Sequence, residues 1–226
     1  MFANTAENME TDEIKIPISE GNNLKGVLTI PSGANAIVIF SHGSGDSRLS
    51  RKNNELAEIL NKEKIATLLT DLLTEQEDIS LENSFNTDLL VGHLTDITKA
   101  VMERPDLQHF KIGYFGAATG AGAALKAAAG SSVAVHAIVS RGGRPNLSKE
   151  ELAEVKVPTL LMVGGLDDEL IGFNQWAFNA LQCEKKLEIV EGASHLLEES
   201  GKLNEVGRLA TGWFAKYLHP DFLLTP

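Results

Sequence analysis

The sequence contains an aspartate and a histidine whose positions suit them to act together on a proton. Asp167 lies in a Gly-Gly-Leu-Asp turn after one predicted strand, and His195 lies in the short loop after the next predicted strand. Because neighbouring parallel strands end at the same edge of a sheet, the two side chains can pair there. The carboxylate would fix the imidazole tautomer and stabilise its cation, as a general base that activates a nucleophile requires.

The nucleophile that this pair would serve is expected on an earlier strand, and position 118 is the candidate. The segment Gly116-Ala117-Ala118-Thr119-Gly120 follows a predicted strand and opens a predicted helix, as does the G-x-S-x-G elbow that presents a catalytic serine. Both glycines are present, but Ala118 stands where the serine belongs. The backbone N–H groups of Thr119 and Ser44 are the predicted oxyanion hole.

Other residues compete for these roles. Thr119 would open the helix with its side chain turned away from the direction of position 118, so it is not expected to be the nucleophile. Cys183 sits at a helix end, where a buried or bystander thiol is the expectation. Asp168 competes with Asp167 for the acid role, although it also suits the entry of the next helix. His42 is expected to bond to the backbone and shape its turn.

Three arginines follow predicted strands at the same sheet edge. Arg48, Arg141 and Arg144 could bind an anionic group of a substrate, since a guanidinium matches a carboxylate in a bidentate manner. The alternative is structural ion pairing with Asp46, Asp71 or nearby glutamates, and the sequence leaves both readings open.

The glycine-rich segment does not match the patterns of nucleotide-binding loops. No Gly-Lys-Ser/Thr follows it, the third glycine of the dinucleotide fingerprint is replaced by Leu125, and no acidic residue lies between 127 and 148 to hold a ribose. No pair of histidines stands at metal-ligand spacing. We therefore expect no cofactor and no metal.

Short apolar runs alternate with helical segments along the chain, and this alternation predicts the elements that position the site. The continuous β-branched run at 36–41 is typical of a strand buried on both faces. Two N-terminal strands followed by repeated β–α units predict an α/β protein with a mostly parallel sheet and helices on both faces. Residues 1–11 are expected to form a loose leader and 12–226 a single domain. Strands are predicted at 13–18, 24–30, 36–41, 65–73, 111–115, 134–140, 157–163 and 186–190, and helices at 51–63, 84–104, 116–130, 148–154, 169–182 and 200–218.

Composition limits the partners. The chain of 226 residues carries a formal net charge of −11, which disfavours nucleic acids and anionic membrane surfaces. One cysteine excludes an intrachain disulfide, no apolar run approaches the roughly 20 residues of a bilayer span, and the N-terminus does not match a secretory signal. We expect a cytoplasmic protein with a small-molecule partner. The apolar tail at 222–224 could pack on its own domain or on a second copy, which leaves a homodimer open.

Six segments together resemble the α/β-hydrolase superfamily, in its small, lidless dienelactone-hydrolase-like branch. The resemblance covers about residues 36–218 and implies a serine at position 118, Asp167 as the acid and a Ser-His-Asp mechanism on esters without a cofactor. Larger hydrolases carry a lid where this chain has only the short segment 141–156. The resemblance therefore implies an open site for small to medium acyl compounds. The segments are FSHGSGDSRLSRKN, TLLTDLLTEQE, GYFGAATGAGAAL, SRGGRPNL, VPTLLMVGGLDDELI and GASHLLEE.

Ala118 then has two explanations. Either the nucleophile has been replaced, which leaves an inactive chain that still binds ligand, or the chain is a naturally non-catalytic binding protein. The first is the preferred hypothesis, because a lineage freed from catalysis has little reason to keep Asp167, His195 and both elbow glycines together.

Overall fold

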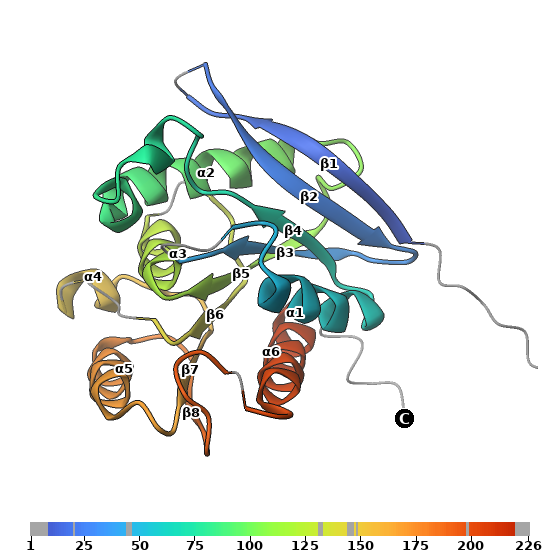
Figure 1. Ribbon diagram of the computed structural model, residues 1–226. Coiled ribbons are helices and arrows are strands. Elements are labelled where there is room, and N and C mark those ends of the chain that lie inside the picture. Colours follow the sequence, from blue (N-terminus) through green and yellow to red (C-terminus); the bar gives the residue numbers. More distant parts are fainter. Residues whose placement is uncertain are drawn as a thin grey trace, which may run out of the picture.

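The computed structural model describes residues 9–19, 21–43, 47–130, 133–143, 147, 149–197 and 199–219. It contains one eight-stranded sheet in the order β1-β2-β4-β3-β5-β6-β7-β8 (Figure 1). β1 pairs antiparallel with β2, and β2 pairs antiparallel with β4, whereas every other neighbouring pair is parallel. The predicted α/β architecture is confirmed. The strands are β1 (Met9–Pro17), β2 (Asn23–Pro31), β3 (Ala36–Ser41), β4 (Ala66–Thr70), β5 (Lys111–Ala117), β6 (Ala137–Arg141), β7 (Thr159–Gly164) and β8 (Lys185–Val190).

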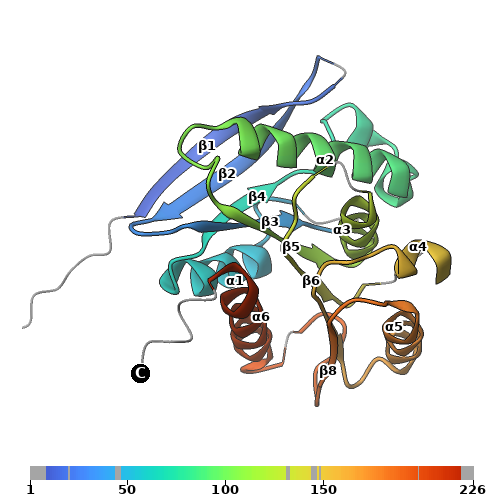
Figure 2. The ribbon, with the colours of Figure 1, turned by 180° about the vertical axis from the view of Figure 1, so that it is seen from behind.

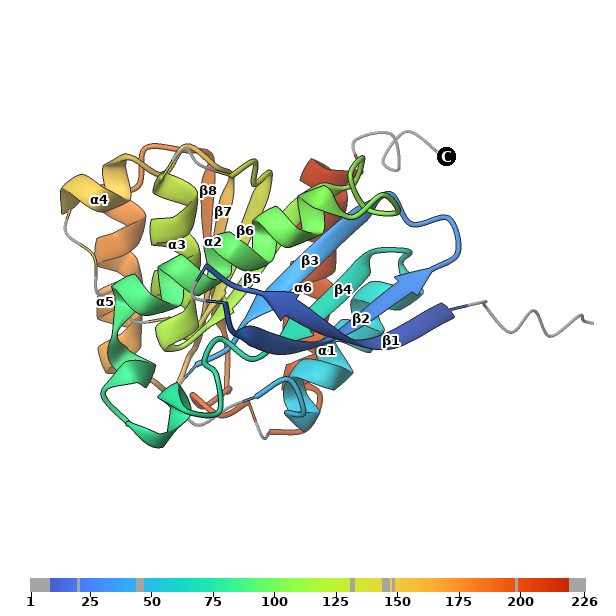
Figure 3. The same cartoon turned by 90° about the horizontal axis from the view of Figure 1, so that it is seen from above.

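Helices cover both faces of the sheet. α1 and α6 lie side by side on one face, and α2 to α5 lie on the other (Figures 1 and 2). Seen from above, the strand direction turns progressively from β1 to β8, which is the usual twist of such a sheet (Figure 3). The helices are α1 (Arg51–Lys62), α2 (Thr87–Glu103), α3 (Thr119–Ala129), α4 (Lys149–Ala153), α5 (Asp168–Ala180) and α6 (Lys202–Leu218), with short 3₁₀ helices η1 (Glu77–Ile79) and η2 (Asn83–Phe85).

Alternating side chains of the central strands supply two hydrophobic cores. In β3, Ile37 and Ile39 join the core under α2 and α3, whereas Val38 and Phe40 join the core under α1 and α6. The Phe40 ring stacks on Phe115 of β5, with 4.9 Å between ring centroids. All six residues of β3 are buried, so the continuous apolar run reflects burial on both faces.

Several boundaries differ from the sequence prediction by three or four residues. β4 ends at Thr70 rather than at 73, α3 begins at Thr119 rather than at 116, and β6 begins at Ala137 rather than at 134. β1 begins at Met9, because Met9 pairs with Pro31 and Thr11 with Thr29 across the hairpin. This edge strand is mostly exposed, so its first residues are polar and resemble a leader. α2 begins at Thr87 rather than near 84, because the Asn86 side chain caps it by accepting a hydrogen bond from the Leu89 amide at 3.2 Å.

The connection from β6 to β7 contains no large lid among its described residues. Its only helix there is α4, which has five residues. In the described part of the chain, no helix combines the length and the apolar character that crossing a bilayer demands.

Candidate active site

Position 118 lies at a sharp turn between β5 and α3. Ala118 has φ 48° and ψ −119°, a backbone conformation that costs a residue with a β-carbon on the order of 1–3 kcal/mol. Its amide donates to the carbonyl of Arg141 at 3.3 Å, and its own carbonyl accepts from the Ala121 amide at 3.2 Å. The turn is therefore held from both sides, as expected for an elbow that presents one side chain above the sheet edge.

Glycines allow the loop after β3 to approach this turn closely. A β-carbon on Gly120 would lie 2.1 Å from the carbonyl oxygen of Ser41, and one on Gly43 would lie 2.6 Å from the β-carbon of Ala118. Since both distances are too short for real atoms, the loop after β3 can contact the elbow only because these residues have no side chain. Thr119 is the first residue of α3, so its amide belongs to a helix N-terminus beside position 118.

His195 and Asp167 meet at the same sheet edge, as predicted. His195 Nδ1 lies 3.5 Å from Asp167 Oδ2, within ion-pair range but longer than a good hydrogen bond. Asp167 Oδ1 accepts from the Leu170 amide at 3.2 Å, so this carboxylate also caps α5 and is held in place. The sequence suits Asp168 to the entry of this helix. The structure shows instead that Asp167 is the N-cap and Asp168 the first residue of α5.

The His195 ring lies beside the strand that anchors the elbow. A β-carbon on Gly142 would be 3.4 Å from both Nδ1 and Cε1 of His195. Gly142 directly follows Arg141, whose carbonyl accepts the hydrogen bond from the Ala118 amide. Ala118 thus contacts the end of β6, His195 lies beside the next residue of that segment, and Asp167 lies beside His195. All three residues are therefore at one edge of the sheet. The ring is 48% exposed, which fits a site that opens to solvent.

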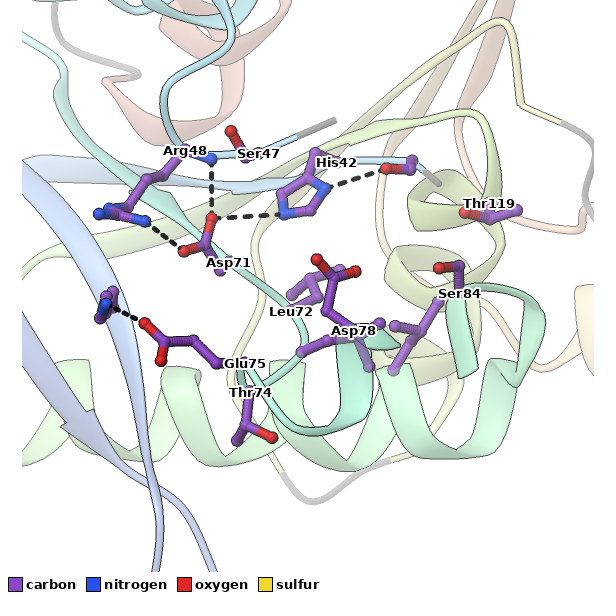
Figure 4. A pocket seen from close by; sticks show the side chains of 14 residues that line it. His42, Ser47, Arg48, Asp71, Leu72, Thr74, Glu75, Asp78, Ser84 and Thr119 are labelled. Carbon is purple, nitrogen blue, oxygen red and sulfur yellow. Dashed lines mark hydrogen bonds and ion pairs between the residues drawn. The ribbon is translucent and has the colours of Figure 1, made fainter. Parts of the chain in front are cut away.

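A cavity of about 240 Å³ adjoins the elbow (Figure 4). Gly43 and Thr119 line the side next to position 118, and Leu72 and Leu90 provide apolar walls. Its remaining lining comes mainly from charged and hydroxyl-bearing side chains of β2, the loop after β3 and the connection from β4 to α2. This volume is somewhat below the roughly 300–1,000 Å³ of typical ligand pockets and can admit a small organic molecule.

Arg48 is engaged by a carboxylate in this cavity. Its amide donates to Asp71 Oδ1 at 2.9 Å, and its Nη1 donates to Asp71 Oδ2 at 2.5 Å. Of the two readings left open by the sequence, the geometry of Arg48 favours ion pairing over substrate binding. Asp71 also faces His42, whose Nε2 is 4.0 Å from Asp71 Oδ1 and whose Nδ1 lies 3.0 Å from the Gly43 carbonyl oxygen, consistent with a turn-shaping histidine.

For the remaining predicted site residues, the structure gives little information on a catalytic or binding role. Arg141 lines a cavity of only about 10 Å³ beside His195, so its role toward a substrate stays a prediction. Ser44 and Arg144 lie outside the described residues. Cys183 lies near Thr159, at the opposite end of β7 from the site, with 3.8 Å between Sγ and Oγ1. Burial raises the pKa of this thiol, which favours the bystander reading.

Several cavity residues were not found from the sequence. Lys25 comes from β2, which reaches the site only because it pairs antiparallel with β4. Glu75, Asp78 and Ser84 come from the connection between β4 and α2, where no motif marks them. The apolar-to-polar change after the strand 65–73 was the only available signal.

Comparison with known proteins agrees with the fold described above. A dienelactone hydrolase from Anabaena variabilis has a solved structure that is 47% identical, with a TM-score of 0.89 over 93% of this chain and 99% of that one. The protein Est1E from Butyrivibrio proteoclasticus shares the fold at 14% identity, with a TM-score of 0.77 over 90% of this chain and 98% of that one. No family model matches the chain.

A curated relative is longer than this chain. It is a protein of Mycobacterium tuberculosis with the provisional name phosphoribosyl transferase, 47% identical over 193 residues. The match covers 85% of this chain but 44% of the mycobacterial protein, so the chain spans less than half of that relative. The chain belongs to the dienelactone-hydrolase-like α/β-hydrolases.

Proposed function

We propose that this scaffold hydrolyses small to medium carboxylic esters when a serine occupies position 118, and that the present chain is an inactive, ligand-binding form. The observation that carries the proposal is the strained turn at Ala118, which keeps φ 48° although alanine has no nucleophile to present. The Asp167–His195 pair at the same edge and the adjoining cavity support it.

In the serine form, His195 would take the hydroxyl proton as Oγ of residue 118 attacks the acyl carbon. Asp167 would stabilise the imidazolium, and the amides of Thr119 and Ser44 would hold the oxyanion. His195 would then return the proton to the leaving alcohol, and a water molecule activated by His195 would release the acid. In this chain the methyl group of Ala118 cannot attack, so binding without turnover is expected.

Two other readings have weaker support. A naturally non-catalytic binding protein would use the same cavity, and the codon at position 118 of the natural gene distinguishes it. Phosphoribosyl transfer is suggested only by the name of the mycobacterial relative. A solved structure that is 47% identical to this chain, and that this chain covers to 99%, is a dienelactone hydrolase, which favours the hydrolase proposal.

The test restores the hydroxyl. Ala118→Ser is assayed on a panel of 4-nitrophenyl esters, thioesters and lactones beside the present chain and the double variant Ala118→Ser/His195→Ala. We expect the serine variant to exceed both by a factor of about 10⁴ or more in kcat. A well-folded serine variant that stays inert on the whole panel would overturn the proposal.

A further inference from the structure

The cavity beside the elbow is lined by more negative than positive side chains. Two cations and three carboxylates line it, and each cation is already paired. Arg48 is bound to Asp71 through two contacts, and Lys25 donates to Glu75. Among the residues that the structure describes, no side chain pairs with the third carboxylate, that of Asp78.

Asp78 is directed toward the site. Figure 4 shows its carboxylate pointing into the cavity, on the side where His42 lies. Asp78 belongs to η1, and the adjacent Glu77 holds this turn in place: its Oε2 accepts from both the amide and the hydroxyl of Thr74 at 2.8 Å. The fold therefore holds the turn that carries this exposed carboxylate.

The turn is also anchored to α2. His93 is buried, donates from Nδ1 to the carbonyl of Leu72 at 2.7 Å and places Nε2 3.5 Å from Glu77 Oε1. Leu72 and Leu90 form an apolar stretch of the same cavity. A ligand that extends from position 118 thus meets an apolar wall and an unpaired negative charge.

We infer that Asp78 is a specificity-determining residue, and that the site selects acyl compounds that carry a cationic amine over those that carry a carboxylate. This inference rests on the proposed function, because it takes position 118 as the place of the acyl carbon. A carboxylate substrate would find both cavity cations engaged and Asp78 repelling it, whereas an ammonium group would find its partner. For an exposed charge pair the preference over a neutral isostere is about fivefold at low salt.

The experiment uses three butyrate esters of similar size: butyrylcholine, its neutral isostere 3,3-dimethylbutyl butyrate, and the butyrate ester of 3-hydroxypropanoate. Binding is measured by calorimetry on the present chain, which does not turn over, and kcat/KM is measured on Ala118→Ser. We expect the order cationic, neutral, anionic in both. Asp78→Asn should bring the cationic-to-neutral ratio close to one, whereas Glu82→Gln, which removes a charge from an exposed residue outside the cavity lining, should preserve the ratio.

The outcomes separate the two proposals. Hydrolysis by Ala118→Ser without a charge preference, or with a preference that Asp78→Asn does not change, overturns the role of Asp78 and leaves the proposed function standing. A preference in binding that depends on Asp78, with no hydrolysis by the serine variant, supports the role of Asp78 and overturns the proposed function. Absence of both binding and hydrolysis overturns both.

Discussion

Replacing Gly120 by alanine should damage the elbow specifically. The new β-carbon would lie 2.1 Å from the Ser41 carbonyl oxygen and 2.4 Å from the His42 carbonyl oxygen. Both are backbone atoms, and the Gly120 carbonyl also accepts the Ser41 hydroxyl at 2.9 Å, so no flexible side chain can move away. The two segments must separate by about 1 Å to make room. We therefore expect a loss in the free energy of unfolding at the upper end of the 1–3 kcal/mol that is typical of overpacking.

The expected size of this effect can be checked against a matched glycine. In a domain of this length each kcal/mol shifts Tm by about 2–4 °C, so Gly120→Ala should lower Tm by about 5–10 °C. Gly92, inside α2, has nothing within 4 Å of an added β-carbon, and Gly92→Ala should stabilise the chain by about 0.5–1 kcal/mol. Calorimetric scans of both variants provide the comparison. If the Tm of Gly120→Ala equals or exceeds that of Gly92→Ala, the close packing of Gly120 against the Ser41 and His42 carbonyl oxygens is wrong.

Two further predictions concern strain and pH. Ala118→Gly should raise Tm by about 2–6 °C, because glycine adopts positive φ without the cost that alanine bears there, and an unchanged or lower Tm would argue against the strain. Burial lowers the pKa of His136 and of His219, and Lys111 adds to both effects. The unfolded chain then binds protons more readily, so the free energy of unfolding should fall as the pH drops below about 6.5. In urea titrations at pH 7 and pH 5, His136→Gln should reduce this fall, while replacing the exposed His109 by glutamine should not; equal falls in both variants would contradict the burial argument.

The fold was largely predictable because its signals are local. Buried parallel strands such as 36–41 read as continuous apolar runs, and the helices between them carry apolar residues at helical spacing. The start of β1 was wrong because an exposed edge strand needs few apolar residues. The short helices η1 and η2 carry no periodicity, since three residues do not complete a pattern.

The site was predictable only where it follows strand ends. Position 118 directly follows β5, and Asp167 and His195 lie in the short loops after β7 and β8. The parallel arrangement therefore brings them to one edge. The pairing of Arg48 with Asp71 depends on how a loop folds back, and the sequence left it open. Lys25 and Asp78 enter the cavity through antiparallel pairing and a 3₁₀ turn, which are long-range and irregular features without a sequence motif.

Covalent labelling tests most directly whether position 118 is the place of the nucleophile. Ala118→Ser is incubated with an alkyl fluorophosphonate, which reacts with an activated serine without requiring the natural substrate, and the modified residue is located by peptide mass spectrometry. The account predicts a single adduct on the serine introduced at 118, none on the present chain, and a much slower reaction in Ala118→Ser/His195→Ala. A folded serine variant that remains unlabelled, or that is labelled at another residue, would contradict it.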